Sequence, residues 1–235
     1  MTEEKHKADP GQMNQTSKNS LFIKFLFIML LVAVGATVVQ QMRQSPGSGT
    51  LINNQTFIEL PDRKPLPVVT LTQAGIGEVT TEMMKGRWHL LFFGYTFCPD
   101  VCPVELSVLH QMMDILREQI ASEQLPQTIF ISIDPERDTP EMTAEYVEYF
   151  DPEFIGLSGT KTDLQILTMP FGITWMKQRN SVSDKKTDEN NYLISHTTTI
   201  ILVNPDMKVA GLFPAPHHAG EMAEMYQKII HKEVR

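Results

Sequence analysis

Residues 93–103 read FGYTFCPDVCP and contain both cysteines of the 235-residue chain. The apolar run RWHLLFF at 87–93 leads into them, and its continuous hydrophobicity between two glycines is typical of a buried strand. Residues 103–120 follow with apolar side chains at three- and four-residue spacing, which predicts an amphipathic helix. The two cysteines are therefore expected at the junction between a buried strand and the start of a helix.

The segments around this junction alternate between strand and helix patterns. Apolar runs bounded by turn residues predict strands, and amphipathic spacing after Thr or Pro predicts helices. The predicted strands are 67–71, 78–80, 128–133, 154–157, 173–178, 198–203 and 208–212, and the predicted helices begin at Pro140 and cover 161–169 and 219–231. This order predicts an α/β, thioredoxin-like fold, in which helices flank a mixed central sheet.

The positive end of a helix stabilises an anion, so Cys98 and Cys102 are expected to form thiolates more readily than an ordinary thiol of pKa about 8.5. If helical geometry begins near Cys98, both sulfurs lie on one face, one turn apart. They can then chelate one soft ion such as Cu(I), or form a disulfide that exchanges electrons with a client. A purely structural disulfide is less favoured, because it would close a loop of only five residues.

An imidazole added to two thiolates makes a site that also suits Cu(II), so a histidine is a candidate third ligand. His196 lies in the segment 192–198, which is predicted as the turn that enters strand 198–203. In a thioredoxin-like sheet that turn would face the cysteines, although an ordinary loop histidine is the alternative interpretation. His110 is expected about 12 Å along the helix from Cys102, too far to share an ion.

A second group of metal-binding side chains lies near the start of the last predicted helix. His217, His218, Met222 and Met225 combine two imidazoles with two thioethers, and both ligand types suit copper. A weak auxiliary copper site is one interpretation. The other, which is favoured, is surface histidines followed by methionines that fill the core.

The N-terminal part of the chain predicts a membrane anchor. Residues 25–39 carry no charge, and the surrounding segment 21–42 is long enough for a transmembrane helix. A cleaved signal peptide is the weaker alternative, because the apolar stretch is long and no A-x-A site follows it. Lysines concentrate before the span, which predicts a cytoplasmic tail at 1–20, a linker at 43–60 and an exported domain at 61–235.

Composition limits the function classes that remain. The net charge is −8 for the whole chain and −10 for residues 45–235, which argues against binding to nucleic acid. Two cysteines are too few for a four-cysteine zinc site or a disulfide-rich scaffold. An exported domain lies where a disulfide can persist, so we expect the bacterial inner membrane with the domain in the periplasm. The mitochondrial inner membrane is a weaker expectation, because the first residues lack arginine.

Three stretches together resemble the Sco/SenC family of copper-binding, membrane-anchored proteins: 93–103, the loop IDPERDTP at 133–140, and Tyr192 to His196 ahead of Asn204 and Pro205. The resemblance implies a thioredoxin fold and a copper ion, Cu(I) or Cu(II), held by Cys98, Cys102 and His196. It further implies help in assembling the CuA centre of cytochrome c oxidase. The implied partners are oxidase subunit II, or another copper or thiol client, and a protein that donates copper.

Two positions around these motifs bear on the site. Family members usually carry Asp directly before the histidine, where this chain has Ser195. Asp134, Arg137 and Asp138 match the acidic loop of the family, and we interpret them mainly as turn and helix-cap residues because Asp-Thr-Pro is a common helix start.

Two functions from different classes remain open. The first is a copper metallochaperone that passes its ion to a client by ligand exchange. The alternative is a periplasmic thiol–disulfide oxidoreductase, in which Cys98 attacks a client disulfide and Cys102 resolves the mixed disulfide. A peroxiredoxin-like activity is less favoured, because Tyr95 stands where that family uses Thr.

Overall fold

The computed structural model describes residues 29, 56–60, 62–179 and 192–233. The chain divides into two units, Met1–Leu51 and Ile52–Arg235, and all described residues except Met29 belong to the second. Among the described residues, no helix combines the length and the apolar character needed to cross a membrane. Apart from Met29, the predicted membrane helix at 21–42 lies outside the described residues, as does most of the predicted linker at 43–60.

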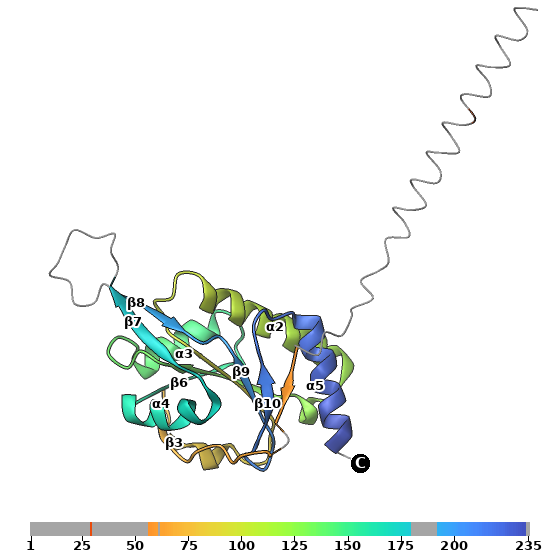
Figure 1. Ribbon diagram of the computed structural model, residues 1–235, viewed down its shortest axis with the longest axis horizontal. Coiled ribbons are helices and arrows are strands. Elements are labelled where there is room, and N and C mark those ends of the chain that lie inside the picture. Colours follow the sequence, from red (N-terminus) through yellow and green to blue (C-terminus); the bar gives the residue numbers. More distant parts are fainter. Residues whose placement is uncertain (1–28, 30–55, 61, 180–191, 234–235) are drawn as a thin grey trace, which may run out of the picture. The chain divides into compact units, whose positions relative to one another are not determined.

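One mixed sheet of eight strands forms the centre of the second unit (Figure 1). Its strands lie in the order β1-β10-β9-β4-β5-β6-β2-β3. Their bounds are β1 Ile58–Glu59, β2 Thr70–Gln73, β3 Gly77–Thr80, β4 His89–Gly94, β5 Gln127–Ser132, β6 Ile155–Gly159, β9 Ile200–Val203 and β10 Val209–Phe213. Strands β4, β5 and β6 run parallel, and the other neighbours pair antiparallel. A separate antiparallel pair consists of β7 (Trp175–Arg179) and β8 (Tyr192–His196).

Helices cover both faces of this sheet (Figure 1). They are α2 Val101–Gln119, α3 Pro140–Glu148, α4 Lys161–Thr168 and α5 Ala219–Glu233, with short 3-10 segments at Thr81–Met84, Ser122–Gln124 and Met169–Phe171. Helix α2 packs against α5. On β6, a Cβ on Gly156 would lie 2.3 Å from the carbonyl oxygen of Thr143 in α3, whereas Gly159 faces Leu164 of α4. Because side chains alternate along a strand, α3 and α4 lie on opposite faces.

The predicted α/β architecture with a mixed central sheet is confirmed, with the ends of most elements shifted by a few residues. The capped helix start is also confirmed, since the Thr139 hydroxyl accepts a hydrogen bond from the Met142 N–H at 3.2 Å. The prediction that 192–198 forms a turn is wrong, because Tyr192–His196 is strand β8. Its buried and exposed positions alternate, which is the signature of a half-buried strand.

Packing at the carboxyl end of β4 determines where α2 begins. All six residues of β4 are buried, and its last residue is Gly94. A Cβ on Gly94 would lie 2.7 Å from the Phe130 ring and 2.8 Å from Cys102 Sγ. Only a glycine lets the ring of β5 and the sulfur of α2 approach the strand this closely, so the FGYT segment positions the second cysteine.

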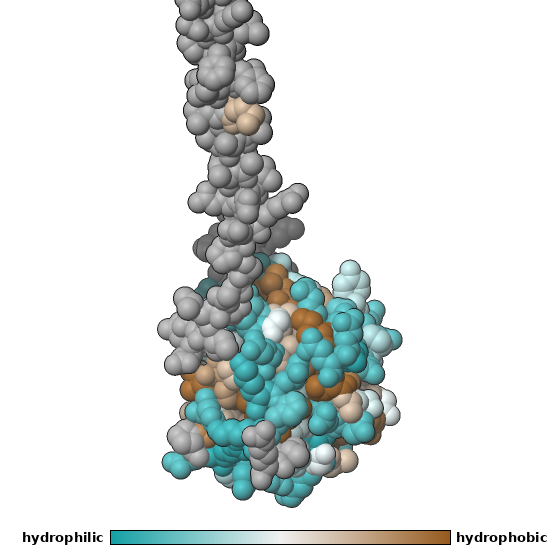
Figure 2. Space-filling view, turned by 90° about the vertical axis from the view of Figure 1, so that its right-hand side faces the viewer, coloured by the Kyte–Doolittle hydropathy of each residue, from teal (hydrophilic) through white to brown (hydrophobic). Residues whose placement is uncertain are grey.

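The surface contrasts with this core. On the face shown in Figure 2, hydrophilic residues cover most of the described surface and hydrophobic residues form small separate areas. The fully buried side chains include Phe92, Phe93, Phe130 and Phe213. Hydrophobic burial around the central sheet therefore supplies the main stabilisation of this domain.

A buried ion pair joins α2 to the segment that precedes α5. His217 Nδ1 lies 2.6 Å from Glu105 Oε2, and its Nε2 lies 2.9 Å from the Phe213 carbonyl oxygen. Both partners can only accept, so both ring nitrogens carry protons and the ring is an imidazolium. Burial alone would lower the pKa of His217, but the hydrogen bonds to Glu105 and Phe213 and the carboxylate charge raise it above the usual 6.5.

We expect this pair to make stability depend on pH. A histidine whose pKa is raised in the folded state stabilises the protein fully below about pH 6.5, and this contribution is lost as pH rises through the folded-state pKa. The free energy of unfolding should therefore fall above neutral pH. Glu105→Gln should lower it by about 3 kcal/mol at pH 6 and flatten its pH dependence, since it leaves a buried cation without its partner.

Urea unfolding between pH 6 and 9 measures both effects. The matched control is Glu224→Gln, which removes an exposed ion pair with Lys228 and should cost less than about 1 kcal/mol. A Glu105→Gln variant with the same pH dependence as the unsubstituted protein would contradict the assignment.

Candidate metal centre

Cys98, Cys102 and His196 converge at the carboxyl end of β4. Their ligand atoms all lie within 4.8 Å of one another, and within the described part of the chain they are the only group of three or more His, Cys, Asp or Glu residues so arranged. Cys102 Sγ lies 3.5 Å from His196 Nε2, although 94 residues separate the two in sequence. Cys102 is buried and Cys98 is partly exposed. The three predicted site residues therefore form one cluster that is accessible from the side of Cys98.

Cys98 precedes the helix and helps to cap it. Helix α2 begins at Val101, and its N-cap residue Asp100 makes no side-chain capping bond. Instead, Cys98 Sγ accepts a hydrogen bond from the Cys102 N–H at 3.4 Å. The Cys98 N–H itself donates to the Tyr95 carbonyl at 3.2 Å, which closes a turn. The condition that helical geometry begins near Cys98 is thus not met, yet the turn still brings the sulfurs together.

The two thiols differ strongly in acidity. A hydrogen bond from the Cys102 side chain lowers the pKa of Cys98 to about 3, against the opposing effect of burial and with further help from His196 and backbone N–H groups. The same hydrogen bond, together with burial, raises the pKa of Cys102. Without a metal, the pair therefore holds a thiolate on Cys98 and a proton on Cys102.

The orientation of His196 suits a metal ligand. Its Nδ1 lies 3.1 Å from the Thr197 carbonyl oxygen, which can only accept, so Nδ1 carries the proton. Nε2 faces the cysteines, and its lone pair can bind a metal once this nitrogen carries no proton. Ser195 is exposed and follows the alternation of β8 away from this side. In this chain a backbone carbonyl therefore holds the imidazole, and the residue before the histidine takes no part.

Asp138 anchors the loop that carries Cys98. Its carboxylate accepts hydrogen bonds from the Thr96 N–H at 2.8 Å, the Thr96 hydroxyl at 2.6 Å and the Ser132 hydroxyl at 2.6 Å. Asp138 is buried, and the helix cap of α3 is Thr139. The interpretation of Asp138 as a helix-cap residue is therefore wrong. Its carboxylate instead connects the cysteine loop to Ser132 at the end of β5.

The same 133–139 loop holds the strand that carries His196. Asp134 accepts hydrogen bonds from the Tyr192 hydroxyl at 2.6 Å and from Arg137 Nε at 2.5 Å. The Arg137 guanidinium donates to the Tyr192 carbonyl at 3.0 Å and stacks on the rings of Tyr192 and Phe97. The interpretation of these residues as turn residues describes only the backbone of this loop. Its side chains connect the segment that carries the cysteines with the strand that carries His196.

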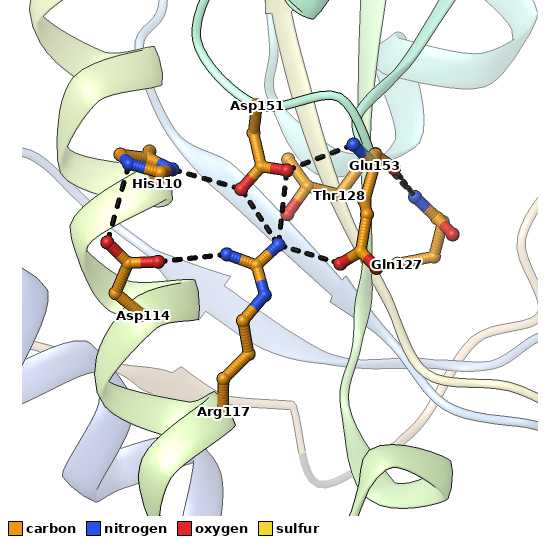
Figure 3. A network of polar contacts seen from close by, with 7 residues as sticks. All are labelled: His110, Asp114, Arg117, Gln127, Thr128, Asp151 and Glu153. Atoms are coloured by element: carbon orange, nitrogen blue, oxygen red, sulfur yellow. Dashed lines mark hydrogen bonds and ion pairs between the residues drawn. The ribbon is translucent and has the colours of Figure 1, made fainter.

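His110 belongs to a different network, on the far part of α2 (Figure 3). Its Nδ1 lies 3.0 Å from Asp151 Oδ2, and Arg117 bonds the same carboxylate at 2.8 and 3.1 Å. Arg117 also contacts Asp114 and Glu153. Asp151 is buried, so this network fastens α2 to the segment between α3 and β6. His110 therefore does not belong to the cluster of Cys98, Cys102 and His196, as predicted.

The proposed auxiliary group has a mixed outcome. His217 is buried with both ring nitrogens engaged, so its description as a surface histidine is wrong, while His218 is exposed as expected. Met222 is fully buried and Met225 packs against the core, which supports the interpretation of core methionines. Metal binding by His217 would require breaking its ion pair with Glu105.

Sequence comparison matches the SCO1/SenC family model to residues 69–231. A relative from Stutzerimonas stutzeri, described as a copper-binding protein, is 33% identical over 183 residues, which cover 78% of this chain and 85% of the relative. The human mitochondrial protein SCO1 homolog is 37% identical over 138 residues, covering 59% of this chain and 44% of the human protein. The match thus spans less than half of the human relative.

Solved structures show the same fold. The crystal structure of Arabidopsis thaliana ScoI with copper bound matches with a TM-score of 0.64 and 29% identity, covering 72% of this chain and 99% of that one. Bradyrhizobium japonicum ScoI with copper bound matches with a TM-score of 0.59 and 31% identity, covering 70% and 99%. Both related structures contain copper.

The acidity of Cys98 predicts an unusual alkylation profile. In the reduced, metal-free protein, iodoacetamide should label Cys98 almost exclusively, because Cys102 is buried and protonated. The labelling rate should change less than about twofold between pH 5 and 7, whereas an ordinary thiol would accelerate roughly 100-fold. Peptide mass spectrometry locates the label, and Cys98→Ser is the control. Labelling mainly at Cys102, or a rate that rises tenfold per pH unit, would contradict this prediction.

Proposed function

Because the chain belongs to the SCO1/SenC family, we propose that it is a membrane-anchored copper metallochaperone that binds one copper ion through Cys98, Cys102 and His196. The observation that carries this proposal is the convergence of two sulfurs and one imidazole nitrogen within 4.8 Å. Thiolates select Cu(I), and adding an imidazole gives a donor set that also holds Cu(II).

The asymmetry of the cluster suits transfer of a cargo ion. Cys98 is a thiolate and partly exposed, so it offers both the first contact for an incoming ion and the position at which a client ligand can enter. Cys102 is buried and releases its proton when it binds the metal, which makes uptake dependent on pH. Stepwise ligand exchange can then proceed without releasing the ion to water.

We further propose the surroundings in which this transfer occurs. Supported by the family membership, the client is subunit II of cytochrome c oxidase, whose CuA centre receives the ion, and a second protein donates copper to this chain. The apolar segment 21–42 anchors the chain in the bacterial inner membrane, with the acidic domain in the periplasm.

One observation favours a second function, thiol–disulfide exchange. A partly exposed thiolate beside a buried, protonated thiol is the arrangement of an attacking and a resolving cysteine. Cys98 would attack a client disulfide and release one client thiolate. Cys102 would lose its proton and attack Cys98, releasing the reduced client and leaving a Cys98–Cys102 disulfide. The electrons come from the dithiol, so the chain needs re-reduction after each cycle.

His196→Ala separates these functions. Loss of one of three ligands should weaken copper binding by the reduced full-length protein by at least about 100-fold, because loss of an outer group alone costs about 10–100-fold. Reduction of a model disulfide by Cys98 and Cys102 should be largely retained. Competition with a chromophoric chelator measures the affinity, and absorption spectroscopy detects the thiolate-to-Cu(II) band.

His218→Ala is the matched control, since it removes an exposed imidazole on another element. An unchanged copper affinity in His196→Ala would overturn the three-ligand site. Absence of copper binding by the unsubstituted protein, with disulfide reduction intact, would favour the oxidoreductase.

A further inference from the structure

Tyr95 contacts all three residues of the cluster. Its carbonyl oxygen accepts the Cys98 N–H at 3.2 Å, and its backbone hydrogen bonds to the Cys102 side chain. Its ring meets the His196 ring edge to face, with centroids 6.0 Å apart. The side chain is 2% exposed, so it belongs to the floor of the site.

The phenol hydroxyl connects the two chain segments that form the cluster. It accepts a hydrogen bond from the Ile194 N–H at 3.2 Å, two residues before His196 in β8. The backbone carbonyl of the same residue holds the Cys98 N–H, so Tyr95 connects the strand of the imidazole with the cysteine loop.

We propose that Tyr95 is a positioning residue for copper: its hydroxyl fixes the register of β8 against the cysteine loop. This contact sets where His196 Nε2 lies relative to the sulfurs. This inference rests on the proposed copper function, but the link to β8 is testable without metal.

Tyr95→Phe tests the proposal, because it keeps the buried ring and removes only the hydroxyl. In the metal-free, full-length protein, the Ile194 amide loses its acceptor and should exchange with deuterium about tenfold faster or more. Copper affinity should fall about tenfold, the lower end of the range for outer-shell groups.

Tyr146→Phe is the matched control. Tyr146 lies on α3 with its ring 5.6 Å from Phe130, and its buried hydroxyl has no hydrogen-bond partner among the described residues. Removing it should leave Ile194 exchange and copper affinity unchanged.

The outcomes distinguish this inference from the proposed function. Unchanged Ile194 exchange in Tyr95→Phe would overturn the role of Tyr95, even if copper binds normally. Faster exchange in a protein that binds no copper would support the link to β8 and overturn the proposed function instead. An equal acceleration of Ile194 exchange in Tyr146→Phe would mean that any loss of a buried hydroxyl disturbs the site, and would also overturn the inference.

Discussion

The hydrogen bond between the two cysteine side chains is the interaction on which the site depends. It leaves the charge on Cys98 and the proton on Cys102, and it exists only because the turn before α2 folds one sulfur back over the helix start. Gly94 makes room for that arrangement, since any side chain there would meet Cys102 Sγ. The chemistry of the thiols is therefore determined by packing at the end of β4, and the helix dipole adds to a preference that the turn has already set.

The position of His196, the third residue of the cluster, depends on a different constraint. His196 lies on the β7–β8 pair, which is separate from the main sheet, so ladder hydrogen bonds to β4 or β9 do not position it. Side chains of the 133–139 loop supply that connection: Asp138 holds the cysteine loop, while Asp134 and Arg137 hold the start of β8. Together with Tyr95, this loop therefore holds Cys102 and His196 close together although 94 residues separate them in sequence.

Sequence periodicity predicted the sheet and its helices well, because the core strands are continuous apolar runs and α3 and α4 begin at capping threonines. The strand–helix junction singled out the two cysteines, whereas His196 stood against an ordinary loop histidine until the resemblance to the Sco/SenC family implied it as the third residue of the site. Sequence periodicity missed β8, whose five residues follow a polar segment, and it misjudged Asp138 and His217. Both errors concern partners distant in sequence. A local Asp-Thr-Pro pattern fully explains a helix start, and nothing near His217 indicates that Glu105 will neutralise it.

The difference in acidity and burial between Cys98 and Cys102 explains why one site suits two chemistries. A thiolate that is stable at low pH is a weaker nucleophile than an ordinary thiolate, because nucleophilicity falls with basicity, but it is always available to a soft cation. The buried Cys102 behaves in the opposite way. It keeps its proton, and it becomes reactive only when it loses that proton on binding a metal or on attacking a mixed disulfide. In the proposed copper site the imidazole is a further ligand, which a client disulfide would not use. The position of His196 would therefore favour metal retention over electron exchange by the cysteine pair.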